Sequence, residues 1–431
     1  QNILAMIGLS LYILADTYFI SKAVGANGIT ALNMALPVYG VIFALGQMVG
    51  VGSAIRYSIV KEQYRNSNKD GSNECDKYFS GALFWGLVIG VIFAVLGLVF
   101  PDKIVEIMGG DETIVAIGVP YFRIFMSFSP FFIFNYTCNA FVRNDGNPSV
   151  SMAATLISSL FNIVFDYILM FPLGMGMPGA ALATALSPVV GVMICMIHFL
   201  SKKNTVKFKW FKTSLTRLFH CCQVGMSAFV GEMSGAVIVM VFNFIILRLT
   251  GNIGVAAYGV VANTALVAVA VFNGVALGSQ PLISESYGKH NIKDIKLIEK
   301  LGVATALGLA VIIVIMIWGF TDTIVGVFNS QGSDRLLSLA RVGLRIYFIG
   351  FLFAGINIFC SSALSAIASV KWAFVLSILK GFVVVNVCAA ILAPIFGMNG
   401  VWVAFPLSEF ILLIVSGFAM KKSIGALESE R

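Results

Sequence analysis

The chain has 431 residues, of which 59% are hydrophobic and only 11% charged, and its mean hydropathy is +0.94. A soluble domain carries about 25% charged residues, so this chain cannot cover a water-facing surface, and it is too hydrophobic to be disordered. Composition therefore predicts an integral membrane protein. Loop lysines and arginines account for the net charge of +8, so the lipid bilayer is the expected environment and no nucleic-acid partner is expected.

Continuous apolar runs, such as 79–100 and 302–318, favour helices over the alternating strands of a membrane barrel. One crossing needs about 20 residues, so the chain has room for about twelve. The expected helices cover residues 2–22, 29–60, 78–100, 113–142, 149–171, 178–200, 215–249, 254–288, 297–319, 335–366, 369–394 and 399–420. The fold class is an all-α polytopic membrane protein.

Three segments of the first half recur, in the same order and at nearly constant spacing, in the second half. The matching pairs are Gly28–Ser53 with Gly254–Ser279, Arg123–Phe125 with Arg345–Tyr347, and Gly176–Gly179 with Gly397–Gly400. The repeat predicts two pseudo-symmetric six-helix bundles, residues 1–200 and 215–431, joined by a basic linker, 201–214. An even number of helices per half makes the repeats parallel, and two such halves suit alternating access.

Most of the 28 Lys and Arg residues fall in loops on one side of the predicted helices. The positive-inside rule then puts both termini in the cytoplasm, in a multi-pass cell-membrane protein. No signal peptide is visible at Gln1, and we expect a short native N-terminus before it. Seven cysteines without a CxxC pair and three scattered histidines predict neither disulfides nor a zinc site. Phosphate-binding and catalytic motifs are absent, so we expect no enzyme, no cofactor and no ATP-driven pump.

Two acids inside predicted helices stand out, because a carboxylate cannot reach far toward the interface. Asp16 follows Tyr12 by four residues and Asp166 follows Asn162 by four, so each pair shares a helix face. Such oxygen-rich side chains suit Na⁺, or a proton shared between two acids. The alternative is two separate acids, each satisfied locally.

Three further charged side chains fall inside predicted helices. Glu232 has no acidic equivalent in the first half, and cation binding and a structural hydrogen bond are both open for it. Lys380 lies near mid-membrane depth and needs an acidic or carbonyl partner. Glu409 could belong to a structural pair.

Five motifs now resemble one family, the bacterial-type multidrug and toxic compound extrusion (MATE) transporters, and the resemblance covers essentially the whole chain. The motifs are Asp16–Gly25 in DTYFISKAVG, Arg143–Pro148 in RNDGNP, Asn162–Thr184, Gly278–Gly288 in GSQPLISESYG and Gly397–Glu409 in GMNGVWVAFPLSE. The resemblance implies twelve helices in two lobes and cation-coupled antiport of organic cations.

The resemblance also implies site residues, carried over by position. The cation site of the first lobe would comprise Tyr12, Asp16, Asn139, Asn162, Asp166 and Thr184. A coupling Na⁺ would lie at Asp16, Asn162 and Asp166, and Glu232 and Gln280 would face the substrate cavity. Two departures count against other features of the family: no acid lies between Asp334 and Glu409 for a second-lobe Na⁺ site, and no proline precedes Pro37 to bend the first helix.

The sequence thus predicts a monomeric secondary transporter that exports organic cations by antiport against H⁺ or Na⁺. The alternative is a lipid-linked sugar flippase of the same architecture, which needs a basic central cavity, whereas the inner charges here are chiefly acidic. A channel would need a selectivity filter, and none is seen. An intramembrane aspartate protease could use Asp16 and Asp166, but the flanking Gly-Asp pattern is missing at both.

Overall fold

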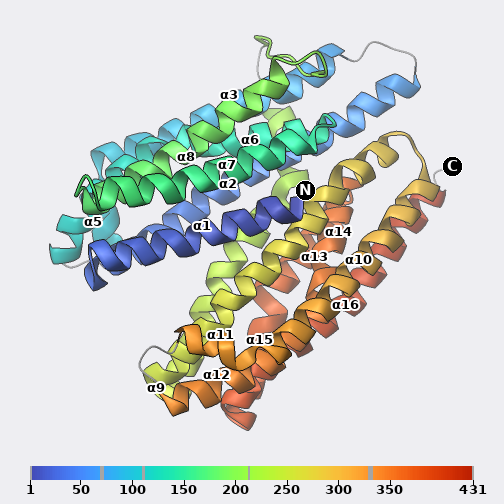
Figure 1. Ribbon diagram of the computed structural model, residues 1–431. Coiled ribbons are helices and arrows are strands. Elements are labelled where there is room, and N and C mark those ends of the chain that lie inside the picture. The colour runs from blue at the N-terminus through green and yellow to red at the C-terminus, as the bar shows by residue number, and fades with distance from the viewer. Residues whose placement is uncertain (1, 68–71, 109–111, 212–213, 329–332, 430–431) are drawn as a thin grey trace. The chain divides into compact units, whose positions relative to one another are not determined.

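The computed structural model is helical throughout, and no strand occurs in the part of the chain that it describes (Figure 1). The described residues are 2–67, 72–108, 112–211, 214–328 and 333–429. The chain divides into two compact units, Gln1–Phe229 and Val230–Arg431. The all-α class expected from the apolar runs is confirmed.

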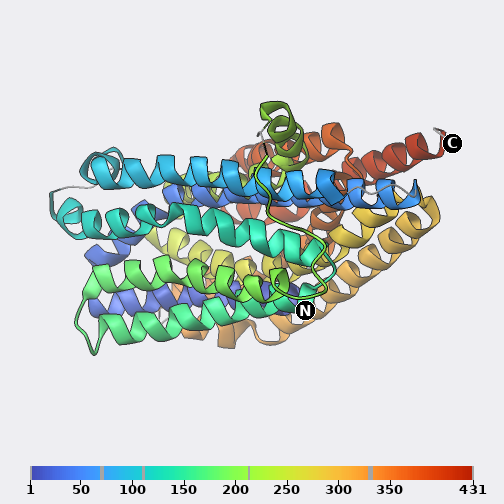
Figure 2. The same cartoon turned by 90° about the horizontal axis from the view of Figure 1, so that it is seen from above.

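The first unit is built from eight helices among the described residues and from the start of α9. Their bounds are α1 Asn2–Ala23, α2 Ala26–Asn66, α3 Ser72–Val99, α4 Pro101–Ile107, α5 Glu112–Ser127, α6 Ser129–Asn144, α7 Pro148–Met170, α8 Gly176–Phe199 and α9 Leu215–Gly288. α7 packs against α1 and α8, while α6 packs against α2, α3 and α8. Beyond α8 the chain runs as an extended linker along this unit (Figure 2).

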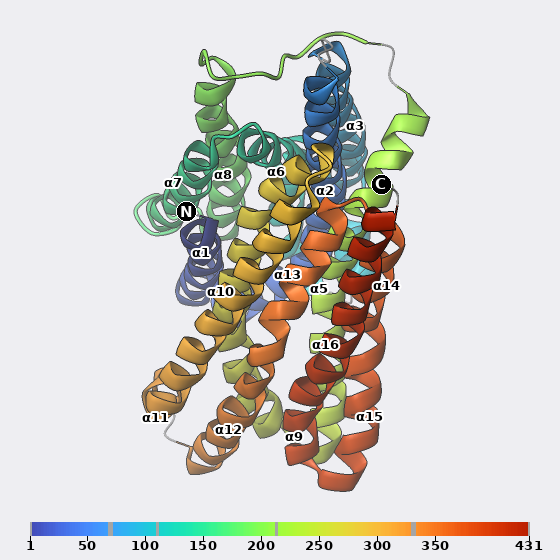
Figure 3. The same ribbon diagram turned by 90° about the vertical axis from the view of Figure 1, so that its right-hand side faces the viewer.

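The second unit contains the rest of α9, which a kink at Gly251 (φ 68°) divides into two membrane-length helices, and the helices that follow it. Their bounds are α10 Ile292–Gly319, α11 Thr321–Phe328, α12 Asp334–Tyr347, the 3₁₀ turn η1 Phe348–Gly350, α13 Phe351–Ala366, α14 Val370–Ile378, the π turn η2 Leu379–Val383, α15 Val384–Phe396 and α16 Met398–Ser429. α13 lies between α10 and α16 and packs against both (Figure 3). The elements of the first unit therefore recur here in the same order, including the short helices α4 and α11.

Ten helices of the described residues are long and apolar enough to cross a membrane, and the bent pair α5 and α6 brings the number to eleven. α1 adds a further helix of 22 residues, and about 20 residues suffice for a crossing. Many of the large side chains on these helices are exposed and apolar, such as Leu98, Ile197 and Ile414, as expected where a surface meets lipid rather than water.

Three expected helices are interrupted, and one of them, 335–366, contains the 3₁₀ turn η1 between α12 and α13. The expected helix 113–142 is broken at Phe128 and bent by 46° between α5 and α6. Pro130 follows at the start of α6 and has no N–H to continue the helix. The expected helix 369–394 contains the π turn η2, which includes Lys380. A π turn is frequent at functional positions, and apolar periodicity does not reveal it.

The boundary between the units falls inside α9 and therefore later than the expected linker, 201–214, of which Lys212 and Thr213 lie outside the described residues. The cause is close packing of the first turns of α9 against α2. A Cβ on Gly52 would overlap the Cys221 backbone, and a Cβ on Gly225 would overlap the Met48 backbone. The glycines therefore hold the start of α9 to the first unit.

The repeated Gly-Met-x-Gly motif opens α8 and α16, each of which forms a hairpin with the preceding helix. A Cβ on Gly179 would approach the Leu169 carbonyl to 3.1 Å, and a Cβ on Gly400 would overlap the Leu392 carbonyl. The second glycine of each motif thus allows two helix backbones to come together. The sequence repeat has the same packing role in both units.

Candidate functional site

The faces of α1 and α7 that carry the predicted acids meet. α1 packs against α7, and the carboxyl groups of Asp16 and Asp166 lie close enough to interact electrostatically. Only 7% of Asp16 and 0% of Asp166 is exposed. Two neighbouring carboxyl groups do not both stay ionised unless a cation lies between them. Without a cation, the pair holds a proton.

One oxygen of each acid, Asp16 Oδ1 and Asp166 Oδ1, is buried without a hydrogen-bond donor among the described residues. Buried polar oxygens are normally satisfied, because an unmade hydrogen bond costs about 1–3 kcal/mol. Each of these two oxygens therefore has unused accepting capacity. The described residues form no group of three or more His, Cys, Asp or Glu that could hold a metal ion.

Asn162 lies beside Asp166 and joins α7 to α8. In the amide orientation that satisfies both of its ends, Nδ2 donates to Asp166 Oδ2 at 3.1 Å and Oδ1 accepts from the Thr184 backbone N–H at 3.3 Å. Asn162 is completely buried and Thr184 nearly so. The structure thus brings together Asp16, Asn162, Asp166 and Thr184 at one point of the first unit.

Tyrosines that the sequence did not single out surround this point. The Tyr121 hydroxyl of α5 lies near Thr184 and interacts electrostatically with both carboxyl groups. The Tyr12 hydroxyl lies 3.2 Å from that of Tyr39, which lies 3.1 Å from that of Tyr136. This chain of hydroxyls links α1, α2 and α6. A lone tyrosine in an apolar helix has no spacing signal that separates it from an ordinary core residue.

Asn139 belongs to a different set of contacts. Its Nδ2 donates to Asn135 O and to Asn135 Oδ1, both at 2.9 Å, and its Oδ1 accepts from Ser151 Oγ at 3.1 Å. These bonds join α6 to α7 rather than to α1. Six residues were predicted for the cation site. Among the described residues, Asn139 is the one of these six that shows no contact with Asp16, Asp166, Asn162 or Thr184.

The two expected substrate-facing residues lie on α9 in the second unit. The Glu232 side chain is exposed. Gln280 is buried, its Nε2 donates to Ser362 Oγ at 3.4 Å, and its Oε1 has no hydrogen-bond donor among the described residues. Gln280 therefore has unused accepting capacity, and Glu232 lies at the surface of α9.

Lys380 has an acidic partner in the second unit. Glu409 is the acid that interacts with it electrostatically. Asn357 Nδ2 donates to Glu409 Oε2 at 2.7 Å, and Asn357 Oδ1 accepts from Ser416 Oγ at 2.8 Å. The partly buried Lys380 and the buried Glu409 and Asn357 thus form a polar group between α13, η2 and α16, as expected for intramembrane charges.

A separate polar centre holds the ends of several helices. Five groups contact the Asp145 carboxylate: Tyr57 OH at 2.5 Å, Lys61 Nζ, His198 Nε2 and the Thr205 backbone N–H at 2.9 Å each, and the Thr205 side-chain hydroxyl. Burial raises the pKa of Asp145, but the hydrogen bonds from Thr205, Tyr57 and Lys61 outweigh it and hold the pKa below its ordinary value. Asp145 is the acid of the RNDGNP motif, so this motif fixes α2, α6, α8 and the linker to one another.

Comparison with known proteins matches this chain to one family. The MatE family model matches residues 2–168 and again residues 228–395, in agreement with the internal repeat. The chain is 26% identical over 415 residues to Multidrug export protein MepA of Staphylococcus aureus (strain bovine RF122 / ET3-1), covering 94% of this chain and 88% of that protein. It is 27% identical over 398 residues to MepA of Staphylococcus aureus (strain MRSA252), covering 91% and 85%.

Solved structures with the same fold are also known. One is described as the outward-facing conformation of a multidrug resistance MATE family transporter of the MOP superfamily; its TM-score is 0.92 at 23% identity, over 99% of this chain and 95% of that one. A MOP superfamily transporter from Pyrococcus furiosus matches with a TM-score of 0.90 at 22% identity, over 99% and 95%. At these identities the likeness shows the fold alone. The double match of the family model, by contrast, shows that the chain belongs to the MatE family of multidrug and toxic compound extrusion transporters, which are membrane transporters and not enzymes.

Proposed function

We propose that this protein exports organic cationic drugs and toxic compounds by antiport against H⁺ or Na⁺. The observation that carries the proposal is the contact between Asp16 and Asp166, both buried and each with an oxygen that lacks a donor among the described residues. A transporter without its own energy source needs an ion that binds one conformation better than another. The carboxyl pair supplies a place where such an ion can be taken up and released.

In this proposal Asp16 and Asp166 exchange the coupling ion. Asn162 and Thr184 orient Asp166, and Tyr12 and Tyr121 supply further hydroxyl groups. Ion binding relieves the repulsion between the two carboxylates. It therefore stabilises the packing of α1 against α7, and ion release weakens that packing. A change at this point of the first unit would shift the balance between outward-facing and inward-facing states.

For the substrate we propose contacts with Glu232 and Gln280. An exposed carboxylate attracts an organic cation, and the unused Gln280 Oε1 can accept a hydrogen bond. The 36 Phe and 17 Met residues provide apolar surface that adapts to ligands of different shape. The proteins named Multidrug export protein MepA support this substrate class, and no comparison favours the flippase alternative.

We further propose that the protein acts as a monomer in the cell membrane with both termini in the cytoplasm. The support is the concentration of basic residues on one side of the predicted helices, since cytoplasmic loops carry an excess of Lys and Arg.

The test is drug export from proteoliposomes in which the H⁺ and Na⁺ gradients are imposed separately. We expect a cationic dye to move against its gradient when one of the two ions is supplied, and to move only downhill when neither is. Transport that is indifferent to both gradients would contradict coupled antiport. Translocation of a fluorescent lipid-linked sugar but not of dye would favour the flippase.

A further inference from the structure

The first unit contains a groove of about 700 Å³ that lies away from the carboxyl pair and that the proposed transport cycle does not use. Its walls come from α3, α6, α8, the linker after α8 and the first turns of α9. The four charged residues among those that line it are all basic, namely Lys77, Lys207, Lys209 and Arg217. The rest of the lining is chiefly apolar and aromatic, as in Leu83, Phe84, Trp85 and Met196.

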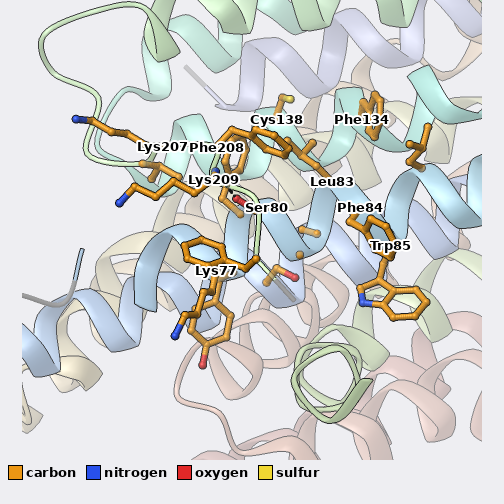
Figure 4. A pocket seen from close by; sticks show the side chains of 18 of the residues that line it. Lys77, Ser80, Leu83, Phe84, Trp85, Phe134, Cys138, Lys207, Phe208 and Lys209 are labelled. Carbon is orange, nitrogen blue, oxygen red and sulfur yellow. Dashed lines mark hydrogen bonds between the residues drawn. The ribbon is translucent and has the colours of Figure 1, made fainter. Parts of the chain in front are cut away.

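The basic side chains gather at one end of the groove, beside Phe208, and only apolar and neutral side chains line the other end. The ammonium groups of Lys77, Lys207 and Lys209 lie at one end, and Trp85 lies at the other (Figure 4). Lys77 and Leu87 both line the groove and are ten residues apart on α3, or about 15 Å at about 1.5 Å per residue. That is about half of the ~30 Å hydrocarbon core. The groove is therefore about as long as one lipid leaflet is thick, and its charged residues all lie at one end.

Hydrogen bonds hold the linker in a defined position at the charged end of the groove. The backbone N–H of Lys207 donates to Asp76 Oδ1 at 2.8 Å, and that of Lys209 donates to Ser80 Oγ at 2.9 Å. These two bonds hold the linker against α3. Lys209 Nζ also pairs with Asp76 Oδ2 at 2.7 Å.

Two acids neutralise part of the basic end but do not line it. Glu74 pairs with Lys77 and with Arg217, and Asp76 pairs with Lys209. The Lys207 ammonium is exposed and has no partner among the described residues. Four basic groups against two acids leave a net positive end, and the opposite end is open to lipid, since Phe84, Leu87 and Met196 are exposed.

We propose that this groove binds an anionic phospholipid, with an acyl chain along Leu83, Phe84 and Leu87 and the phosphate held by Lys77, Lys207, Lys209 and Arg217. Basic pockets between membrane helices are suited to anionic headgroups. Trp210 and Phe208 on the linker are exposed and stack on each other, as aromatic side chains do at the membrane interface. A soluble phosphate would not use the apolar length of the groove.

The headgroup half of the proposal is tested by native mass spectrometry of the full chain with phosphatidylglycerol or phosphatidylcholine added. The wild-type protein should retain phosphatidylglycerol preferentially. Lys207→Gln/Lys209→Gln should weaken phosphatidylglycerol binding by about thirtyfold, since each of the two basic residues contributes about 1 kcal/mol near a lipid surface. The matched control is Lys202→Gln/Lys203→Gln, which removes two charges from the same linker outside the groove and should keep the preference. Equal binding of both lipids by the wild type, or equal loss in the control, would overturn the proposal.

The proposed position of the acyl chain is tested by a substitution that fills the groove. A Cβ on Gly81 meets no atom within 4 Å, so Gly81→Leu should project into the groove and reduce the binding of both lipids. Gly308→Leu on α10, where a Cβ is also unopposed, is the matched control and should have no effect. Wild-type protein with phosphatidylglycerol carrying a diazirine in its acyl chain gives a readout independent of variant folding. Crosslinks should appear on α3 and α8 at the groove, and crosslinks found only elsewhere would overturn the proposal.

Discussion

Glu232 is exposed on α9, where a carboxylate can meet a cationic substrate directly. Glu232→Gln keeps the shape of the side chain and removes its charge. We expect about tenfold weaker binding of cationic drugs, because a hydrogen bond to a charged group contributes about 1.5–3 kcal/mol, and little change for neutral compounds. Equilibrium binding by fluorescence polarisation measures both.

The control for Glu232 is Glu285→Gln, which changes another glutamate of α9 that is already paired with Lys289. This variant should bind all substrates as the wild type does. An equal loss of cationic and neutral ligands in Glu232→Gln would indicate a role in folding rather than in substrate binding.

The two acids of the carboxyl pair can be predicted from the sequence, but the residues around them cannot. Asp16 and Asp166 are visible because a charge in an apolar helix is costly and each shares a helix face with a polar partner. Their meeting depends on α1 packing against α7, which no spacing within one helix reports. Tyr121 and Tyr39 are missed for the same reason, since their relation to the acids exists only after the helices pack.

At the scale of elements, long apolar runs predict the membrane helices well because length and hydropathy alone decide a crossing. The breaks at Phe128 and at the π turn η2 depend on local packing and were not predicted. The short helices α4 and α11 span only 7 and 8 residues, which is about two turns and too few for a periodic pattern to stand out.

Packing of the helix hairpins can be tested with two glycines of α16. A Cβ on Gly400 would overlap the Leu392 carbonyl, whereas a Cβ on Gly417 meets nothing within 4 Å. Gly400→Ala should therefore destabilise the protein by about 1–3 kcal/mol through overpacking. Gly417→Ala should be neutral or gain about 0.5–1 kcal/mol, because alanine loses less backbone entropy in a helix.

Thermal unfolding in detergent measures both glycine variants, with Gly417→Ala as the matched control on the same helix. A lower Tm for Gly400→Ala only is the expected result. Equal Tm values for the two variants would show that the α15–α16 hairpin does not require the close approach at Gly400.

At the scale of the whole molecule, the proposed orientation makes a direct prediction about accessibility. Single cysteines in an otherwise cysteine-free chain should be labelled by an impermeant maleimide from outside the cell at Leu173→Cys, in the loop between α7 and α8. Lys207→Cys, in the basic linker, should react only after the membrane is permeabilised. Labelling of Lys207→Cys in intact cells would reverse the proposed topology.

We propose that Asp16 and Asp166 act as one unit that couples an ion gradient to drug export. The most direct measurement compares gradient-driven drug efflux from proteoliposomes with equilibrium drug binding for Asp16→Asn, Asp166→Asn and the double variant. Each single variant should lose gradient-driven efflux by at least about tenfold while still binding drug, because one carboxyl group no longer needs a cation to offset the other. The double variant should be no worse than the worse single variant, as expected for groups that act together. Full gradient-driven efflux by Asp16→Asn would contradict the account.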